Sequence, residues 1–131
     1  MSHVTVAVDD LPAAEKFYVD VLDGVPLPDQ GATVPGGASR YVVVGEDTII
    51  ELLAPGNGDS THARDLARVG PSVTGVTFTV RDISTASEWL GLAGDEFVAN
   101  ATDHELRLDV AKTWGCEYRF TDRVLTGDPR G

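Results

Sequence analysis

Residues 3–12 decide the fold, and they read HVTVAVDDLP. The first six alternate, so that Val4, Val6 and Val8 share one face, which is the period of a half-buried strand. The acidic pair at 9–10 then offers an N-cap, and a proline follows in the first helical turn, where its missing N–H costs nothing. The stretch therefore predicts a strand that runs directly into a helix.

The same pattern restarts seventy-two positions later, with a strand over 75–80 and a second helix behind it. The first helix is expected to end at Asp23-Gly24, because apolar residues recur at helical spacing up to that point. The matched pairs, all without a gap, include Val4 with Val76, Thr5 with Thr77, Asp10 with Asp82, and Ala14 with Ala86. The chain is therefore predicted to hold two diverged copies of one unit.

Three further strand candidates follow each helix, so each copy is predicted to be a βαβββ module of an α+β fold. They cover 25–30, 40–45 and 47–54 in the first copy, and 95–101, 104–110 and 115–121 in the second. We expect a single domain over 1–131, with module one at 1–55, a linker at 56–73, module two at 74–124 and a tail at 125–131. Ser60 or Thr61 is expected to cap a short linker helix that runs to about Arg68, and the tail is expected to be extended or loose.

Composition excludes several classes of protein. The 131 residues carry a net charge of −11, which opposes binding to nucleic acid, and no apolar run approaches the roughly 18 to 20 residues that cross a bilayer. A cytoplasmic location is the default expectation. The single cysteine, Cys116, excludes an intramolecular disulfide and a multi-cysteine metal site.

The chain resembles the glyoxalase/bleomycin-resistance/extradiol-dioxygenase superfamily, also called the vicinal oxygen chelate superfamily. The resemblance is most specific over 3–11 with Ala14, Phe17 and Tyr18, and over 49–55; it is fainter over 75–83 and 113–115. It implies two tandem βαβββ modules that form a cupped mixed sheet with the helices on its outer face. It also implies a small-molecule ligand in the cup, a homodimer, and a divalent metal held by His from a first strand and Glu from a fourth strand.

In the first copy, His3 falls on the first-strand ligand position of that family and Glu51 on the fourth-strand position. Strand alternation predicts that both side chains face the cup. In the second copy, Gly75 stands in place of His3, so one ligand is missing. On the last strand either Arg119 or Glu117 takes the place of Glu51, and we favour Arg119 because it aligns the neighbouring apolar residues.

Two protein ligands seldom hold a catalytic divalent ion, so the resemblance predicts an incomplete metal site at His3 and Glu51. We hypothesise that the Arg119 guanidinium replaces the missing cation and pairs with the Glu51 carboxylate. If burial raised its pKa, Glu51 would also be suited to act as a general base.

Other polar residues share the parity that is expected to face the cup, and they are candidates for ligand binding: Thr5, Thr77, Thr79, Glu117, Arg119 and Thr121. His62 and His104 are poor ligand candidates, because the first lies in the linker and the second shares the parity of apolar residues.

Three functions stay open at this point. The first is a protein that binds a small molecule, cationic or aromatic, without transforming it, as the bleomycin-resistance branch does. The second is a divalent-metal-dependent lyase, isomerase or dioxygenase that uses His3 and Glu51. The third is a structural or regulatory subunit whose cup is filled by side chains, and fold resemblance cannot choose among them.

Overall fold

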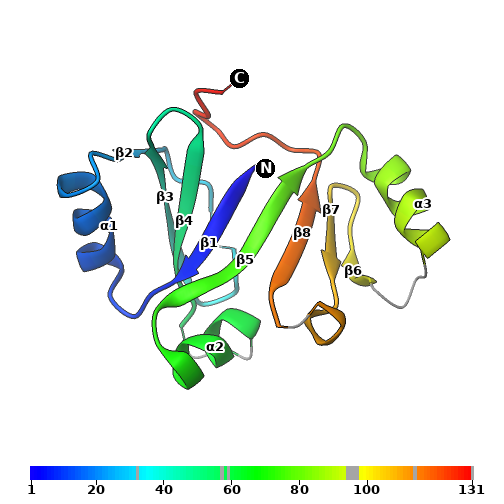
Figure 1. Ribbon diagram of the computed structural model, residues 1–131, viewed down its shortest axis with the longest axis horizontal. Helices are drawn as coiled ribbons and strands as arrows, with labels where there is room; N and C mark the ends of the chain where they lie inside the picture. Colours follow the sequence, from blue (N-terminus) through cyan, green and yellow to red (C-terminus); the bar gives the residue numbers. More distant parts are fainter. Residues whose placement is uncertain (32, 57, 59, 94–97, 114, 131) are drawn as a thin grey trace. The chain divides into compact units, whose positions relative to one another are not determined.

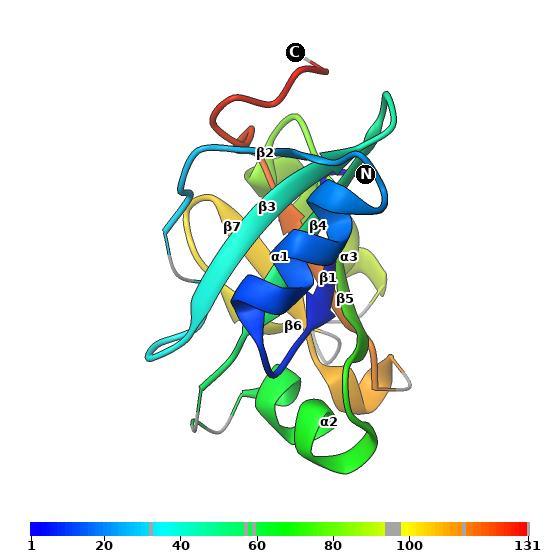
Figure 2. The same cartoon turned by 90° about the vertical axis from the view of Figure 1, so that its left-hand side faces the viewer.

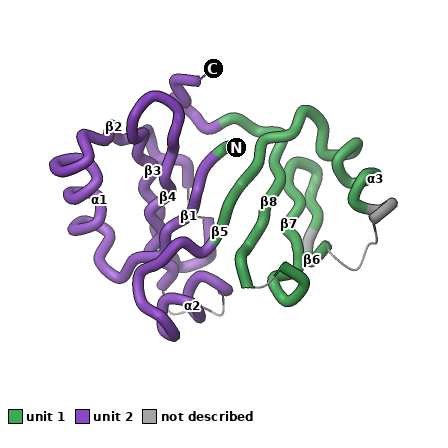
Figure 3. Tube along the Cα trace, in the orientation of Figure 1, with its two compact units in different colours: residues 1–2, 75–124 green, residues 3–74, 125–131 purple. Residues whose placement is uncertain are grey.

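The computed structural model describes residues 1–31, 33–56, 58, 60–93, 98–113 and 115–130. The chain forms two compact units, which Figure 3 shows in different colours. Unit 1 contains residues 1–2 and 75–124, and unit 2 contains residues 3–74 and 125–131. Each unit is built around one of the two predicted modules.

Unit 2 has the predicted βαβββ order (Figure 1). Its elements are β1 (His3–Ala7), α1 (Leu11–Asp20), β2 (Val25–Pro26), β3 (Ala38–Val44) and β4 (Thr48–Ala54), followed by α2 (Thr61–Val69). The strands lie in the order β2-β3-β4-β1; β2 and β3 are antiparallel, β3 and β4 are antiparallel, and β1 is parallel to β4. Helix α1 lies across β3 and β4, as Figure 2 shows.

Unit 1 repeats this order. Its elements are β5 (Ser72–Thr79), which starts within unit 2, then α3 (Ile83–Ala93), β6 (Val98–Ala101), β7 (Glu105–Leu108), a short 3₁₀ helix (Val110–Lys112) and β8 (Glu117–Thr121). The strands lie in the order β6-β7-β8-β5, with β5 parallel to β8. The predicted α+β class and the duplicated module are confirmed.

The helices begin where the sequence predicts. The Asp10 side chain accepts a hydrogen bond from the Ala13 amide at 3.1 Å and so caps α1. Ser60 caps α2 in the same way, with 3.1 Å to the Ala63 amide, which confirms a helix in the linker. After α1 the chain turns at Asp23, whose φ of 57° lies in the left-handed region.

The second strand is much shorter than expected. The prediction covered 25–30, whereas β2 contains only Val25 and Pro26. The prolines at 26 and 28 have no N–H to donate, so a regular ladder cannot continue through this segment.

On β1 the valine face is not the more deeply buried one, although the alternation of apolar residues would suggest it. His3, Thr5 and Ala7 are buried, whereas Val4 and Val6 are only half-buried. The face that carries polar side chains is therefore the more enclosed one. Such a face needs internal hydrogen-bond partners, because buried polar groups without them are costly.

The C-terminal tail is held against unit 2, so the expectation of a loose tail was wrong. Leu125 packs beside the buried cluster of Tyr41, Val43 and Ile49. Gln30 bonds Thr126 twice, accepting from its amide at 2.8 Å and donating to its carbonyl at 2.9 Å. The Arg130 guanidinium donates to the Asp47 carbonyl at 3.2 Å. The tail thus fastens both the segment after β2 and the turn before β4.

Within the described part of the chain, the helices are too short or too polar to span a lipid bilayer.

Candidate functional site

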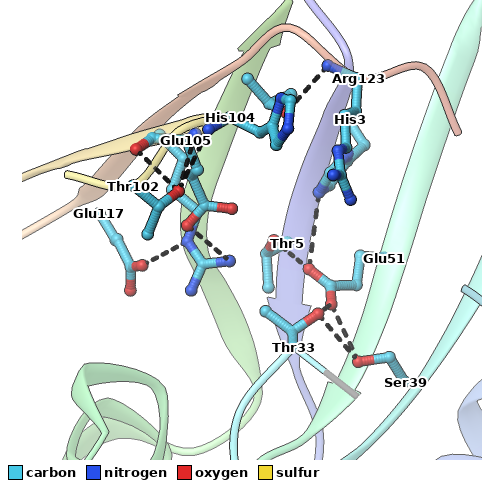
Figure 4. Close-up of polar contacts among 12 residues, drawn as sticks. His3, Thr5, Thr33, Ser39, Glu51, Thr102, His104, Glu105, Glu117 and Arg123 are labelled. Carbon is cyan, nitrogen blue, oxygen red and sulfur yellow. Dashed lines mark hydrogen bonds and ion pairs between the residues drawn. The ribbon is translucent and has the colours of Figure 1, made fainter. Parts of the chain in front are cut away.

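The Glu51 carboxylate is the centre of a buried polar cluster in unit 2, shown in Figure 4. Its Oε1 accepts a hydrogen bond from Thr5 Oγ1 at 2.6 Å, and its Oε2 accepts from Ser39 Oγ at 2.9 Å and from Thr33 Oγ1. His3 Nε2 lies 3.7 Å from Oε1. These five residues are called the Glu51 cluster below. All of the cluster residues that contact the Glu51 carboxylate belong to unit 2.

Strand register brings the cluster together. Thr5 on β1 lies beside Glu51 on β4, and Tyr41 on β3 lies on its other side. Ser39 is two residues from Tyr41 on the same strand, so its side chain points to the same face. His3 is likewise two residues from Thr5, and its ring meets Tyr41 edge to face at 5.2 Å between centroids. Two neighbouring strands, β1 and β3, therefore aim polar side chains at the carboxylate on β4 between them.

Thr33 reaches the cluster from the loop before β3, and Gly37 allows that approach. A Cβ on Gly37 would lie 2.7 Å from Val34 Cγ2 and 2.8 Å from the Ala54 carbonyl oxygen. Because both distances are shorter than real contacts, any larger residue would push the loop away from the end of β4. The absence of a side chain at position 37 is what lets the loop fold closely over Glu51.

The pKa of Glu51 lies below its usual value, although burial is the largest single influence and acts in the opposite direction. Hydrogen bonds from Thr33 and Thr5, the charge of His3, and the bond from Ser39 together outweigh that desolvation. The cluster therefore holds Glu51 in its charged form. The raised pKa that would suit a general base is not what this environment produces, and that role stays a prediction that the pKa does not favour.

The lowered pKa gives the cluster a testable pH dependence. Since the folded pKa lies below the unfolded reference of 4.5, the carboxylate stabilises the fold fully above that pH and loses its contribution as the pH falls further. The variant Glu51→Gln cannot titrate. We therefore expect its free energy of unfolding, measured by urea denaturation between pH 6 and 3, to fall less steeply with acidification than that of the wild type. Parallel profiles would contradict an ionised Glu51.

Thr33, Ser39 and Tyr41 were not recognised in the sequence as part of a site. Residues 39 and 41 could have been found, since alternation along β3 places them on the face that Glu51 occupies on the next strand. Thr33 carried no such signal, because loop residues have no period.

The second copy places Arg119 where the first has Glu51. Thr5 pairs with Glu51 across β1 and β4, and its counterpart Thr77 pairs with Arg119 across β5 and β8. Within unit 1, Arg119 Nε bonds Glu117 Oε1 at 2.6 Å, and Arg119 Nη1 lies 3.9 Å from Glu105 Oε1. Glu117 is buried, so this ion pair supplies the compensation that a buried carboxylate needs.

The register is the one that the sequence favoured, whereas the proposed pairing of Arg119 with Glu51 stays a prediction. Each of these two charged groups has partners in its own unit: hydroxyl groups and His3 for Glu51, and two glutamates for Arg119.

The remaining candidates are placed as follows. Thr77 is buried, Thr79 is exposed, and Thr121 Oγ1 accepts a bond from the Arg123 amide at 3.1 Å. Their roles in ligand binding stay predictions.

The other two histidines make contacts of their own. His62 is the buried residue of α2, with its Nδ1 2.7 Å from Thr74 Oγ1, and His104 Nδ1 lies 3.0 Å from Asp122 Oδ1. Both contacts are explained by local structure.

The donor set does not fit the divalent metal that the family resemblance implies. Among the described residues, no three His, Cys, Asp or Glu side chains gather in a way that could hold a metal ion. His3 and Glu51 converge, but both carboxylate oxygens of Glu51 already accept hydrogen bonds from hydroxyl groups. A catalytic metal commonly takes three protein ligands, so this pair falls short.

Comparison with solved structures finds the same fold at low sequence identity. Methylmalonyl-CoA epimerase from Mycobacterium tuberculosis is 23% identical, with a TM-score of 0.76 over 92% of this chain and 85% of that chain. A hypothetical protein from Bacillus halodurans C-125 is 23% identical, with a TM-score of 0.74 over 98% and 96% of the two chains. A variant of methylmalonyl-CoA epimerase from Streptomyces coelicolor, in complex with 2-nitronate-propionyl-CoA, is 18% identical, with a TM-score of 0.78 over 96% of each chain.

A comparison with curated proteins finds no match. The sequence profile of one family matches residues 2–110, which is most of the chain and includes the whole Glu51 cluster. The chain belongs to the Glyoxalase/Bleomycin resistance protein/Dioxygenase superfamily.

Proposed function

We propose that this protein binds a small organic amine in its cationic form and releases it unchanged, with the Glu51 cluster as the selecting element. The observation that carries the proposal is a fully buried carboxylate whose pKa is lowered by three hydroxyl donors and by His3. A carboxylate stabilised in this way is a weak base, and both of its oxygens already accept hydrogen bonds. Both features favour binding over proton abstraction.

The hydroxyl groups of the cluster donate their protons to Glu51, and this supports a ligand that itself donates hydrogen bonds. Each hydroxyl has one proton, and Thr5, Thr33 and Ser39 give theirs to Glu51. Toward any other molecule these hydroxyls can act only as acceptors. Thr33 is the least enclosed of the three, since it is half-buried while the other two are buried. An ammonium group satisfies such acceptors, and the net charge of −11 raises its local concentration.

The test compares benzylamine with benzyl alcohol, which differ in charge but little in shape. Isothermal titration calorimetry at pH 7 is expected to show the amine bound about tenfold more tightly, which corresponds to about 1.4 kcal/mol. Thr33→Val and Glu51→Gln should each reduce that preference, whereas the control Thr102→Val, at an exposed position in unit 1, should leave it unchanged. Equal affinity for amine and alcohol in the wild type would refute the proposal.

The alternative function is a divalent-metal-dependent lyase, isomerase or dioxygenase. It is favoured by the convergence of His3 and Glu51 to 3.7 Å from the first and fourth strands of unit 2. The structural neighbours named methylmalonyl-CoA epimerase make an isomerase of acyl-CoA esters the member of this class to assay. One tightly bound equivalent of Mn, Ni or Zn in protein stripped with a chelator, together with epimerisation of methylmalonyl-CoA that Glu51→Gln abolishes, would replace the binding proposal by this one.

Two further properties are proposed on the family resemblance and the composition alone. These are a homodimer, which sedimentation of the purified chain tests, and a cytoplasmic location, which fractionation of cells tests.

A further inference from the structure

We propose that unit 1 carries a second binding site, an amphipathic groove beside α3 that takes an aromatic carboxylate. The groove has a volume of about 470 Å³, which lies in the range of small-ligand sites. All the residues that line it belong to unit 1, so it is separate from the Glu51 cluster.

The groove exists because α3 packs mainly against β7. Ile83 and Leu106 are buried, and they mark the covered side of the helix. On the other side, toward β8, the helix leaves Phe120 only half-buried. Phe120 stacks on Phe78 at 5.6 Å between ring centroids, so aromatic rings form this part of the sheet surface. The space between the helix and these rings is therefore bounded by apolar atoms.

The lining changes character along the helix. Ala86, Trp89 and Leu90 give the groove an apolar wall, and Trp89 is 71% exposed, which is unusual for so large a ring. The polar residues Arg81, Asp82 and Thr85 all stand at the N-terminal end of α3. A groove with one polar end and an apolar body matches a ligand with one polar group and a flat apolar ring system.

The polar end carries one charge of each sign, and Arg81 is the one left to meet a ligand. Asp82 uses both carboxylate oxygens to cap α3, accepting from the Ser84 amide at 2.9 Å and from Thr85 Oγ1 at 3.1 Å. Arg81 is exposed and has no ion-pair or hydrogen-bond partner for its guanidinium among the residues that the structure describes. The Asp82 carboxylate faces the positive end of the helix dipole, which offsets its negative charge beside Arg81. A guanidinium pairs with a carboxylate through two parallel bonds, so the polar group of the ligand is a carboxylate.

The test uses three probes with one ring system: naphthaleneacetate, naphthaleneethanol and naphthaleneethylamine. Calorimetry should show the carboxylate bound most tightly. Arg81→Gln should weaken the binding of the carboxylate about tenfold and leave the binding of the alcohol unchanged. Arg123→Gln is the matched control, since it removes the same charge from another exposed arginine of unit 1. Ala86→Leu, which narrows the groove, should weaken carboxylate and alcohol alike, and Trp89→Ala provides a second groove variant should Ala86→Leu fail to fold.

Several results would overturn the second site. Equal weakening by Arg81→Gln and Arg123→Gln would mean that only the overall charge matters. Tighter binding of the amine than of the carboxylate would contradict the assigned charge, and carboxylate binding that is indifferent to both groove variants would place the ligand elsewhere. Self-association of the chain that Trp89→Ala abolishes would assign this face to a second copy instead.

Discussion

The double variant Thr5→Val, Thr33→Val is expected to lose about 3–6 kcal/mol of unfolding free energy at pH 7, the largest effect among the changes considered. Each substitution removes one hydroxyl that donates to the buried Glu51 carboxylate while keeping the shape of the side chain. A hydrogen bond to a charged group contributes about 1.5–3 kcal/mol, and a carboxylate with too few donors remains buried at full desolvation cost. Urea denaturation at pH 7 measures the loss.

Two controls isolate the role of the carboxylate. Thr79→Val makes the same chemical change at an exposed strand position and should alter stability by less than about 0.5 kcal/mol. The difference in unfolding free energy between the wild type and the double variant should also shrink as the pH falls below the unfolded pKa of 4.5. A protonated carboxyl group needs fewer hydrogen-bond donors than a carboxylate. A deficit below about 1 kcal/mol at pH 7, or one that does not depend on pH, would show that the hydroxyl groups do not stabilise the charge.

Ending the chain after Val124 is expected to cost about 2–4 kcal/mol. The truncation removes Leu125 from its place beside Tyr41, Val43 and Ile49, and it removes both bonds between Gln30 and Thr126. The ordering entropy of the lost residues offsets part of this contribution. Thermal and urea unfolding of the truncated chain would give the loss.

A chain that ends after Pro129 provides the matched comparison. It keeps Leu125 and the Gln30 bonds and loses the contacts of Arg130, among them those with Asp128 and the Asp47 carbonyl. Because these contacts are at the surface, the expected loss is below about 1 kcal/mol. Equal stability of both truncated chains and the full chain would mean that the tail does not hold unit 2 together.

The fold could be predicted because local and repeated patterns agreed. The alternation of 3–8, the cap at Asp10 and their recurrence at 75–82 are local signals, and the structure confirms each of them. The strand expected over 25–30 is wrong beyond Pro26, because the prolines at 26 and 28 lack the N–H groups that a regular ladder needs. The ordered tail was missed because its partners at Gln30 and Asp47 lie far away in sequence.

The candidate site was predictable only in part. His3 and Glu51 were found through parity and family resemblance, and the register that places Arg119 in the second copy followed from aligning apolar faces. The direction of the Glu51 pKa could not be found in this way. It depends on three hydroxyl donors, and Thr33 is brought in by a loop whose path depends on the packing of Gly37. Sequence periodicity contains no information on such a path.

The brevity of β2 also restricts how two copies of this chain can associate. The Leu27 amide donates inward to the Tyr41 carbonyl at 2.8 Å, so the amides of its neighbours in sequence would face outward from β3. Those neighbours are Pro26 and Pro28, which have no amide hydrogen. The outer edge of β2 therefore offers no regular row of N–H donors to an incoming strand. This protects the edge of the sheet from edge-to-edge aggregation. A homodimer of this chain must accordingly form through side chains or through another edge, and not by extending the sheet past β2.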